Sequence, residues 1–249
     1  MTKMGADAIK SIYVGNIPIK KAFVGTDLVF NGQKSRLPEG YTELAYISNP
    51  NLGALTTIGS VYNPVTKYRL EIKLRLNDLS KAGRIYGAER SQTYVNGNYS
   101  YGGSYLAYSA DSRSISMRSA KTGIPVNEEI LDLVVDSSQS LFSINGVEGE
   151  FASSYIAAYG GGTGSLLFGT RYENVYKQNK PVISSGGTMD FNLYSFKAID
   201  ITGGTAGQIL SEYVPCVSPD DEVGVYDVAR EIFQKSWVNG TVFVAGPAI

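Results

Sequence analysis

The chain has 249 residues, 43% of them hydrophobic, which is enough to bury the core of one large β-domain and too apolar for a disordered chain. Its 22 basic and 23 acidic residues give a formal net charge of −1 without a basic stripe, so we expect no nucleic-acid partner. No apolar run approaches the roughly 20 residues that span a bilayer, and the first ten residues lack the apolar core of a signal peptide.

Catalytic chemistry is restricted by two residue counts. There is no histidine, which excludes Ser–His–Asp and Cys–His catalysis and histidine-bound metals. The single cysteine, Cys216, excludes an intrachain disulfide and fits folding in a reducing cytoplasm.

The first predicted elements form a short internal repeat. SIYVG at Ser11–Gly15 returns ten residues later as KAFVG at Lys21–Gly25, and each copy has the pattern strand, glycine turn, strand. Two hairpins of roughly 20 residues cannot bury a core alone. They must either attach to a partner chain or add strands to the main domain, and the sequence leaves both interpretations open.

After a polar linker at residues 31–36, the main domain is expected from Leu37 to Ile249. Tyr68–Leu76 alternates between apolar and charged residues, as a half-buried antiparallel strand does. Many short strands without intervening helices predict an all-β sandwich. The predicted strands are Tyr68–Leu76, Arg84–Ala88, Tyr105–Tyr108, Ser114–Arg118, Glu129–Asp136, Ser140–Ile144, Ser165–Thr170, Phe191–Ile199, Ile209–Val214, Val223–Tyr226 and Thr241–Val244.

Carboxylates do not form a catalytic motif. A retaining glycosidase needs two facing carboxyl groups about 5 Å apart. The nearest candidates are Glu128, Glu129, Asp132 and Asp136, which we interpret as the solvated face of a strand. We therefore expect a protein that is not an enzyme and needs no cofactor.

Two loops are candidates for binding. SPDDEVG, with Asp220, Asp221 and Glu222, has the composition of an ordinary β-turn, although a calcium site there stays open. The segment TYVNGNYSYGGSY is interpreted as a recognition loop, in which tyrosines offer contact area at low entropic cost. Its residues Tyr94, Tyr99, Tyr101 and Tyr105 are candidates for glycan or receptor contact, for subunit contact, or for a plain structural role. The only tryptophan, Trp237, is expected in the core.

Residues 9–30 resemble a short repeat found near the ends of phage and prophage structural proteins. The resemblance rests on IYVG and AFVG and implies that Tyr13, Val14, Gly15, Phe23, Val24 and Gly25 attach the chain to another virion protein. Residues 37–249 resemble a laminin-G-like, concanavalin A-like jelly-roll domain of phage and prophage proteins of gut bacteria. The segments FNLYSFKAID, YVPC, GVYD and GTVFVAGP carry this second resemblance, whereas NLGALTTIGSVYN departs from the family pattern.

Together the two resemblances imply a non-catalytic bacteriophage virion protein, such as a head fibre, a capsid decoration or a tail appendage. Residues 1–36 would be an attachment segment, and residues 37–249 a lectin-like domain for host-surface glycans. The expected location is the virion, after synthesis in the host cytoplasm, with no membrane insertion. The expected partners are other virion proteins and further copies of the chain, with a homotrimer favoured. The alternative is a secreted or cell-surface carbohydrate-binding module of a gut bacterium, against which the missing signal peptide argues.

Overall fold

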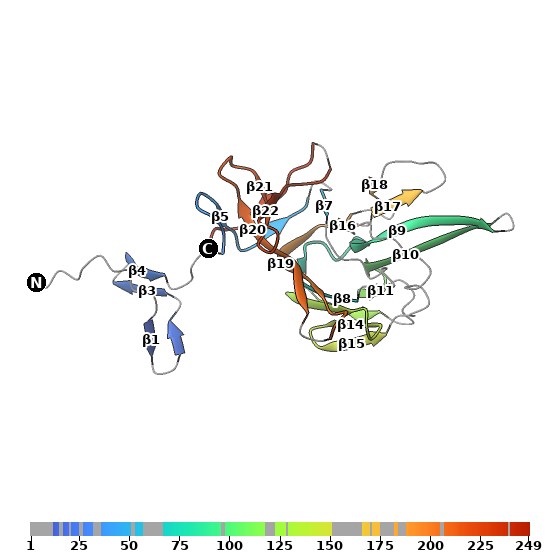
Figure 1. Cartoon of the computed structure of the whole chain (residues 1–249), viewed down its shortest axis with the longest axis horizontal. Coiled ribbons are helices and arrows are strands. Elements are labelled where there is room, and N and C mark those ends of the chain that lie inside the picture. Colours follow the sequence, from blue (N-terminus) through green and yellow to red (C-terminus); the bar gives the residue numbers. More distant parts are fainter. Residues whose placement is uncertain are drawn as a thin grey trace, which may run out of the picture. The chain divides into compact units, whose positions relative to one another are not determined.

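The computed structural model describes residues 36–50, 53–56, 67–95, 98–117, 123–127, 129–150, 166–169, 171–174, 182–183, 188–204, 207–238 and 240–249, together with four short strands between residues 12 and 31. All regular elements of this part of the chain are strands (Figure 1). The chain divides into two compact units, Met1–Pro38 and Glu39–Ile249. This division falls within two residues of the boundary that the polar linker suggests.

The first unit contains two separate hairpins. β1 (Ile12–Val14) pairs antiparallel with β2 (Ile17–Ile19), and β3 (Lys21–Val24) pairs antiparallel with β4 (Asp27–Asn31). The repeat therefore predicted both hairpins correctly. Each hairpin is a two-stranded sheet of its own.

The larger sheet of the second unit has the order β15-β14-β13-β8-β19-β20-β21-β22, with β5 beside β20, β6 beside β19, and β23 beside β6. The long strand β8 alternates strictly between buried and more exposed residues, as its sequence pattern predicted. The strands are β5 (Thr42–Glu43), β6 (Ile47–Ser48), β8 (Tyr68–Leu76), β13 (Leu131–Asp136), β14 (Leu141–Ile144), β15 (Val147–Glu150), β19 (Phe191–Asp200), β20 (Gln208–Val217), β21 (Val223–Asp227), β22 (Ile232–Gln234) and β23 (Val244–Ala245).

The smaller sheet has the order β12-β11-β10-β9-β16-β7, with β17 beside β9 and β18 beside β17. All described pairings of this sheet are antiparallel except that of β17 with β9, which is parallel. The strands are β7 (Leu55–Thr56), β9 (Gly83–Val95), β10 (Asn98–Ser109), β11 (Ser114–Met117), β12 (Ile124–Pro125), β16 (Leu166–Leu167), β17 (Arg171–Asn174) and β18 (Val182–Ile183).

One hydrophobic core joins the two sheets, because buried residues of both belong to a single packed cluster. Tyr86 of β9 lies 6.1 Å from Phe196 of β19, measured between ring centroids. Phe168, which follows β16, stacks on Phe191 of β19 at 4.2 Å. The coarse prediction of an all-β chain with two sheets around one core is therefore confirmed.

The last described residues lie beside the first strands of the second unit. Val244 of β23 pairs with Ser48 of β6, and the antiparallel contact continues as a bridge between Leu44 and Ala248. On its other side β6 pairs with β19. The segment 43–48 is thus held between strands that come much later in the sequence.

Candidate recognition surfaces

The four candidate tyrosines belong to a long hairpin, so their interpretation as loop residues is wrong. β9 and β10 pair antiparallel from Gly83 and Tyr108 at the base to Val95 and Asn98 at the far end. Their far end extends away from the other labelled strands of the two sheets (Figure 1). The predicted strands Arg84–Ala88 and Tyr105–Tyr108 lie within β9 and β10 but are too short, because glycine, asparagine and serine between the tyrosines are typical of turns.

The backbone register of this hairpin places the tyrosines along both strands. Tyr94 lies directly opposite Tyr99, whereas Tyr101 lies opposite Ser91 and Tyr105 opposite Gly87. The side chains of Tyr94, Tyr99 and Tyr101 lie outside the described part of the structure. The register alone therefore shows that two of the four candidates are cross-strand neighbours.

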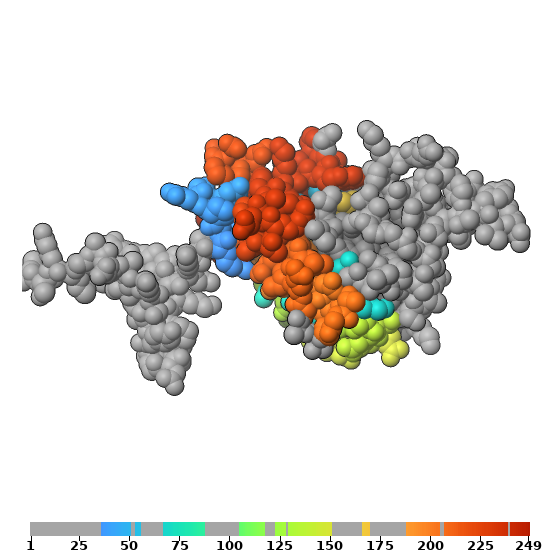
Figure 2. Space-filling view, in the orientation of Figure 1, coloured from blue at the N-terminus to red at the C-terminus, as the bar shows by residue number. Residues whose placement is uncertain are grey.

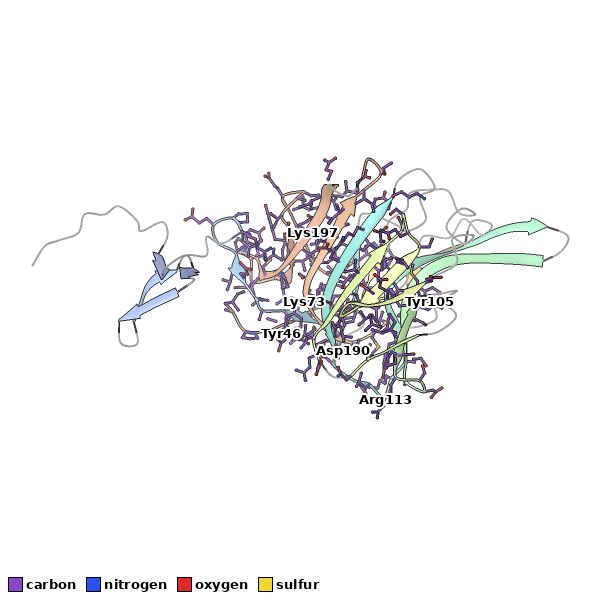
Figure 3. All side chains as sticks on the ribbon, turned by 90° about the horizontal axis from the view of Figure 1, so that it is seen from below. Tyr46, Lys73, Tyr105, Arg113, Asp190 and Lys197 are labelled. Atoms are coloured by element: carbon purple, nitrogen blue, oxygen red, sulfur yellow. The ribbon has the colours of Figure 1, made fainter. Side chains whose placement is uncertain are left out.

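Tyr105 lies at the base of the hairpin, where its side chain is half-buried. The guanidinium carbon of Arg84, on the neighbouring strand, lies 4.2 Å from the centroid of the Tyr105 ring. Such a cation–π contact holds the ring in place and covers one of its faces. A sugar could therefore stack only on the opposite face of Tyr105, whose position appears in Figure 3.

Four of the six attachment candidates take equivalent places in the two N-terminal hairpins. Tyr13 and Val14 end β1, and Phe23 and Val24 end β3. Val14 pairs with Ile17 across the first turn, as Val24 pairs with Asp27 across the second. Gly15 and Gly25, which follow directly, lie outside the described residues.

Charged side chains of β8, β13, β19 and β20 lie on the outer face of the larger sheet, and two of them, Lys73 and Lys197, are labelled in Figure 3. The alternation of β8 and β13 puts these side chains opposite the core face, and most of them are paired. Lys197 Nζ lies 3.4 Å from the carboxylate of Glu212, and Lys73 Nζ lies 3.7 Å from that of Asp132. Asp132 belongs to the solvated row that the sequence suggested.

Asp136, the second carboxylate of that row, organises the turn that follows β13. Its Oδ1 accepts hydrogen bonds from the backbone N–H of Ser138 at 2.8 Å and from the Ser138 hydroxyl at 2.6 Å. The Gln139 side-chain amide donates to its other oxygen at 3.3 Å. A carboxylate that caps a turn in this way has a structural task.

A shallow cleft of about 200 Å³ lies beside this turn on the outer face. Neighbouring positions of four strands form it, because Asp136 lies opposite both Arg69 and Leu141, and Ser143 lies opposite Glu148. It combines a guanidinium, carboxylates, an amide and a hydroxyl, which can hydrogen-bond a hydroxyl-rich ligand. The volume is below the roughly 300 Å³ at which pockets for drug-sized ligands begin, so it suits a single small ring. Sequence reasoning missed this cleft, because its residues come from separate strands.

The acidic turn SPDDEVG is built around Ser218. The Ser218 hydroxyl accepts hydrogen bonds from the backbone N–H groups of Asp220 at 3.3 Å and Glu222 at 3.2 Å. Glu222 is neutralised by Lys235, whose Nζ lies 2.7 Å from its carboxylate. Within the described part of the chain, no group of three or more Cys, Asp or Glu side chains is arranged to hold a metal ion.

A buried carboxylate, Asp227, lies at the end of β21 and was missed by sequence reasoning. It is fully buried, as is Ser211, whose hydroxyl donates a hydrogen bond of 2.5 Å to its Oδ2. Its Oδ1 accepts from the backbone N–H groups of Glu212 at 3.0 Å and Ala229 at 3.2 Å. The bonds from Ser211 and Glu212 tie β20 to the end of β21, and the bond from Ala229 closes the turn that follows, so the arrangement stabilises the fold.

Burial keeps two further side chains of β20, the Cys216 thiol and the Tyr213 phenol, in their neutral forms. Burial raises the pKa of the Cys216 thiol to about 12, so that the thiol stays protonated near neutral pH. Burial also raises the pKa of Tyr213 to about 12. Neither residue offers the ionised nucleophile that covalent catalysis requires.

Trp237 is 39% exposed, so its expected place in the core is wrong. Its backbone N–H donates to the carbonyl of Ala54 at 2.7 Å, which fixes the segment but leaves much of the indole outside. The aromatic core is filled by other rings, such as Phe243, which contacts Phe168 at 5.3 Å.

No helix in the described part of the chain is long and apolar enough to cross a membrane. Comparison with protein-family models finds no family that matches the chain, and comparison with curated proteins finds no match.

Proposed function

We propose that this chain is a non-catalytic structural component of a bacteriophage particle, in which Met1–Pro38 attaches to another virion protein and Glu39–Ile249 is displayed. The observation that carries the proposal is that the chain divides into two units and that each hairpin of the first unit is a two-stranded sheet of its own. Isolated two-stranded hairpins are marginally stable in water. A partner surface would supply the burial that they lack.

The displayed unit would serve as a lectin-like adhesion domain for host-surface glycans. The resemblance of residues 37–249 to jelly-roll domains suggests this role, and two surfaces offer suitable chemistry. One is the tyrosine-rich hairpin β9–β10, and the other is the polar cleft around Arg69 and Asp136. Aromatic rings stack on sugars, whereas polar clefts bind sugar hydroxyl groups.

Attachment is tested with phage particles that lack this protein. The full chain is compared with a variant in which Tyr13→Ala and Phe23→Ala are combined, and with a matched control, Tyr41→Ala, in the second unit. We expect the full chain and the control to bind particles and the double variant to lose binding. Equal binding by all three would refute attachment through the hairpins.

Adhesion is tested separately on immobilised glycans. Tyr99→Ala removes a ring of the hairpin, and Arg69→Ala removes the guanidinium of the cleft. Loss of binding in one variant assigns the glycan to that surface. Failure of the unmodified chain to bind any glycan or host cell would refute adhesion while leaving the attachment proposal standing.

A further inference from the structure

Strand β10 has one backbone edge that the described strands leave open over much of its length. On one side β10 pairs with β9 from Asn98 to Tyr108. On the other side, within the part of the chain that the structure describes, β11 pairs only with Leu106–Ser109. No described strand pairs with the stretch Asn98–Ser104 on that side. Such an edge is a template for another strand.

Several other edges of the two sheets of the second unit carry features that discourage strand pairing. β15 has the exposed carboxylates Glu148 and Glu150, β12 contains Pro125, and the C-terminal edge contains Pro247. β7, β18 and β22 are too short to bind a long strand. By contrast, the stretch from Ser91 to Tyr105 has neither a charged residue nor a proline. Charge, proline and short length are the devices by which edges resist association.

The sequence centred on this edge is also nearly palindromic. Read from Tyr99 to Tyr105 it is Tyr-Ser-Tyr-Gly-Gly-Ser-Tyr, with Gly102 at the centre. If two copies pair antiparallel about Gly102, Ser100 lies opposite Ser104 and Tyr99 opposite Tyr105. The one mismatch places Tyr101 opposite Gly103, and an aromatic ring opposite a glycine stabilises a strand pair by covering the bare backbone.

We propose that β10 pairs antiparallel with β10 of a second copy of this chain, about a two-fold axis at Gly102. The contact is self-complementary, as closed two-fold contacts are, and it joins the smaller sheets of both copies into one continuous sheet. Because the edge is uncharged, identical strands meet without repulsion. The contact does not depend on a virion role. It produces a dimer, whereas the phage resemblance favours a trimer.

The register is tested by a charge swap in the full chain, with mass measured by light scattering. Combining Ser100→Lys with Ser104→Lys places lysines opposite one another in both halves of the contact. The matched variant, Ser100→Lys with Ser104→Glu, places lysine opposite glutamate at the same positions. We expect twice the 26.8 kDa chain mass for the wild type and the matched variant, and the mass of one chain for the double-lysine variant.

A second experiment does not depend on whether the chain folds with lysine or glutamate at positions 100 and 104. With Gly102→Cys, oxidation should yield a covalent dimer, because directly opposite strand residues lie within disulfide distance. Ser138→Cys, in an exposed turn after β13, is the control and should remain monomeric after oxidation. A monomeric wild type, a mass unchanged by the two lysines, or no cross-link through Gly102→Cys would overturn the proposal. If both swapped variants are monomeric, the cross-link decides.

Discussion

Asp227→Ala should lower the free energy of unfolding of the second unit by about 3 kcal/mol. The carboxylate accepts hydrogen bonds from three donors, and the substitution removes all three acceptor contacts. Ala229 is exposed, so its N–H can bond to water instead. The Ser211 hydroxyl is fully buried and the Glu212 N–H partly so. Each buried donor left without an acceptor costs about 1–3 kcal/mol, which gives the expected loss.

The assay is urea unfolding followed by the fluorescence of Trp237. Since this is the only tryptophan, the signal reports on the second unit. The urea concentration at the midpoint should fall. The dependence of the unfolding free energy on urea concentration should stay constant, because the substitution changes little of the surface area that unfolding exposes. Asp111→Ala, in an exposed turn, is the control and should stay within about 0.5 kcal/mol of the wild type.

Asp227→Asn separates hydrogen bonding from simple space filling. The amide oxygen can still accept from Glu212, while the amide nitrogen can donate to the Ser211 hydroxyl. We therefore expect a loss of about 1 kcal/mol, well below that of the alanine variant. Two results would refute the reasoning: an alanine variant as stable as the wild type, or equal losses for alanine and asparagine.

Three further predictions concern the same end of the larger sheet. Gly224→Ala should cost more than about 2 kcal/mol, because its Cβ would lie 2.2 Å from the carbonyl oxygen of Gln234. Gly203→Ala, with open space around its Cβ, should be neutral by the same urea assay. Cys216 should not react with a thiol reagent at about pH 8 until the chain unfolds, because burial raises its pKa to about 12. The pKa of Tyr213 is also raised to about 12, so the folded state favours the neutral phenol. Its contribution to stability should be complete below about pH 10 and should decline as the pH rises toward about 12. A melting temperature that stays constant across that range would contradict this.

Local patterns in the sequence predicted much of the larger sheet. The alternation of Tyr68–Leu76 identified both the strand and its buried face. The predicted neighbouring strands Glu129–Asp136 and Ser140–Ile144 do form the β13–β14 hairpin. Asn145 and Gly146, which both have positive φ, make the tight turn between β14 and β15, a strand that was not predicted. These elements were predictable because neighbours in sequence decide them.

Features that depend on distant residues were not predictable. The length of β9 and β10 was missed because cross-strand pairing overrides the turn propensity of their glycines and asparagines. Asp227 looks like an ordinary turn residue until Ser211, on another strand, is placed beside it. The cleft at Arg69 needs four strands in register. Trp237 was misplaced because aromatic character alone does not show which rings fill the core.

The pairing of β23 with β6 also constrains how the chain folds during synthesis. Ile47 and Ala245 are register partners, although about 200 residues separate them. At a translation rate of roughly 5–20 residues per second, segment 43–48 waits about 10–40 s for this neighbour. The second unit therefore cannot finish folding while it emerges from the ribosome. Until β23 has emerged, β6 stays without this neighbour.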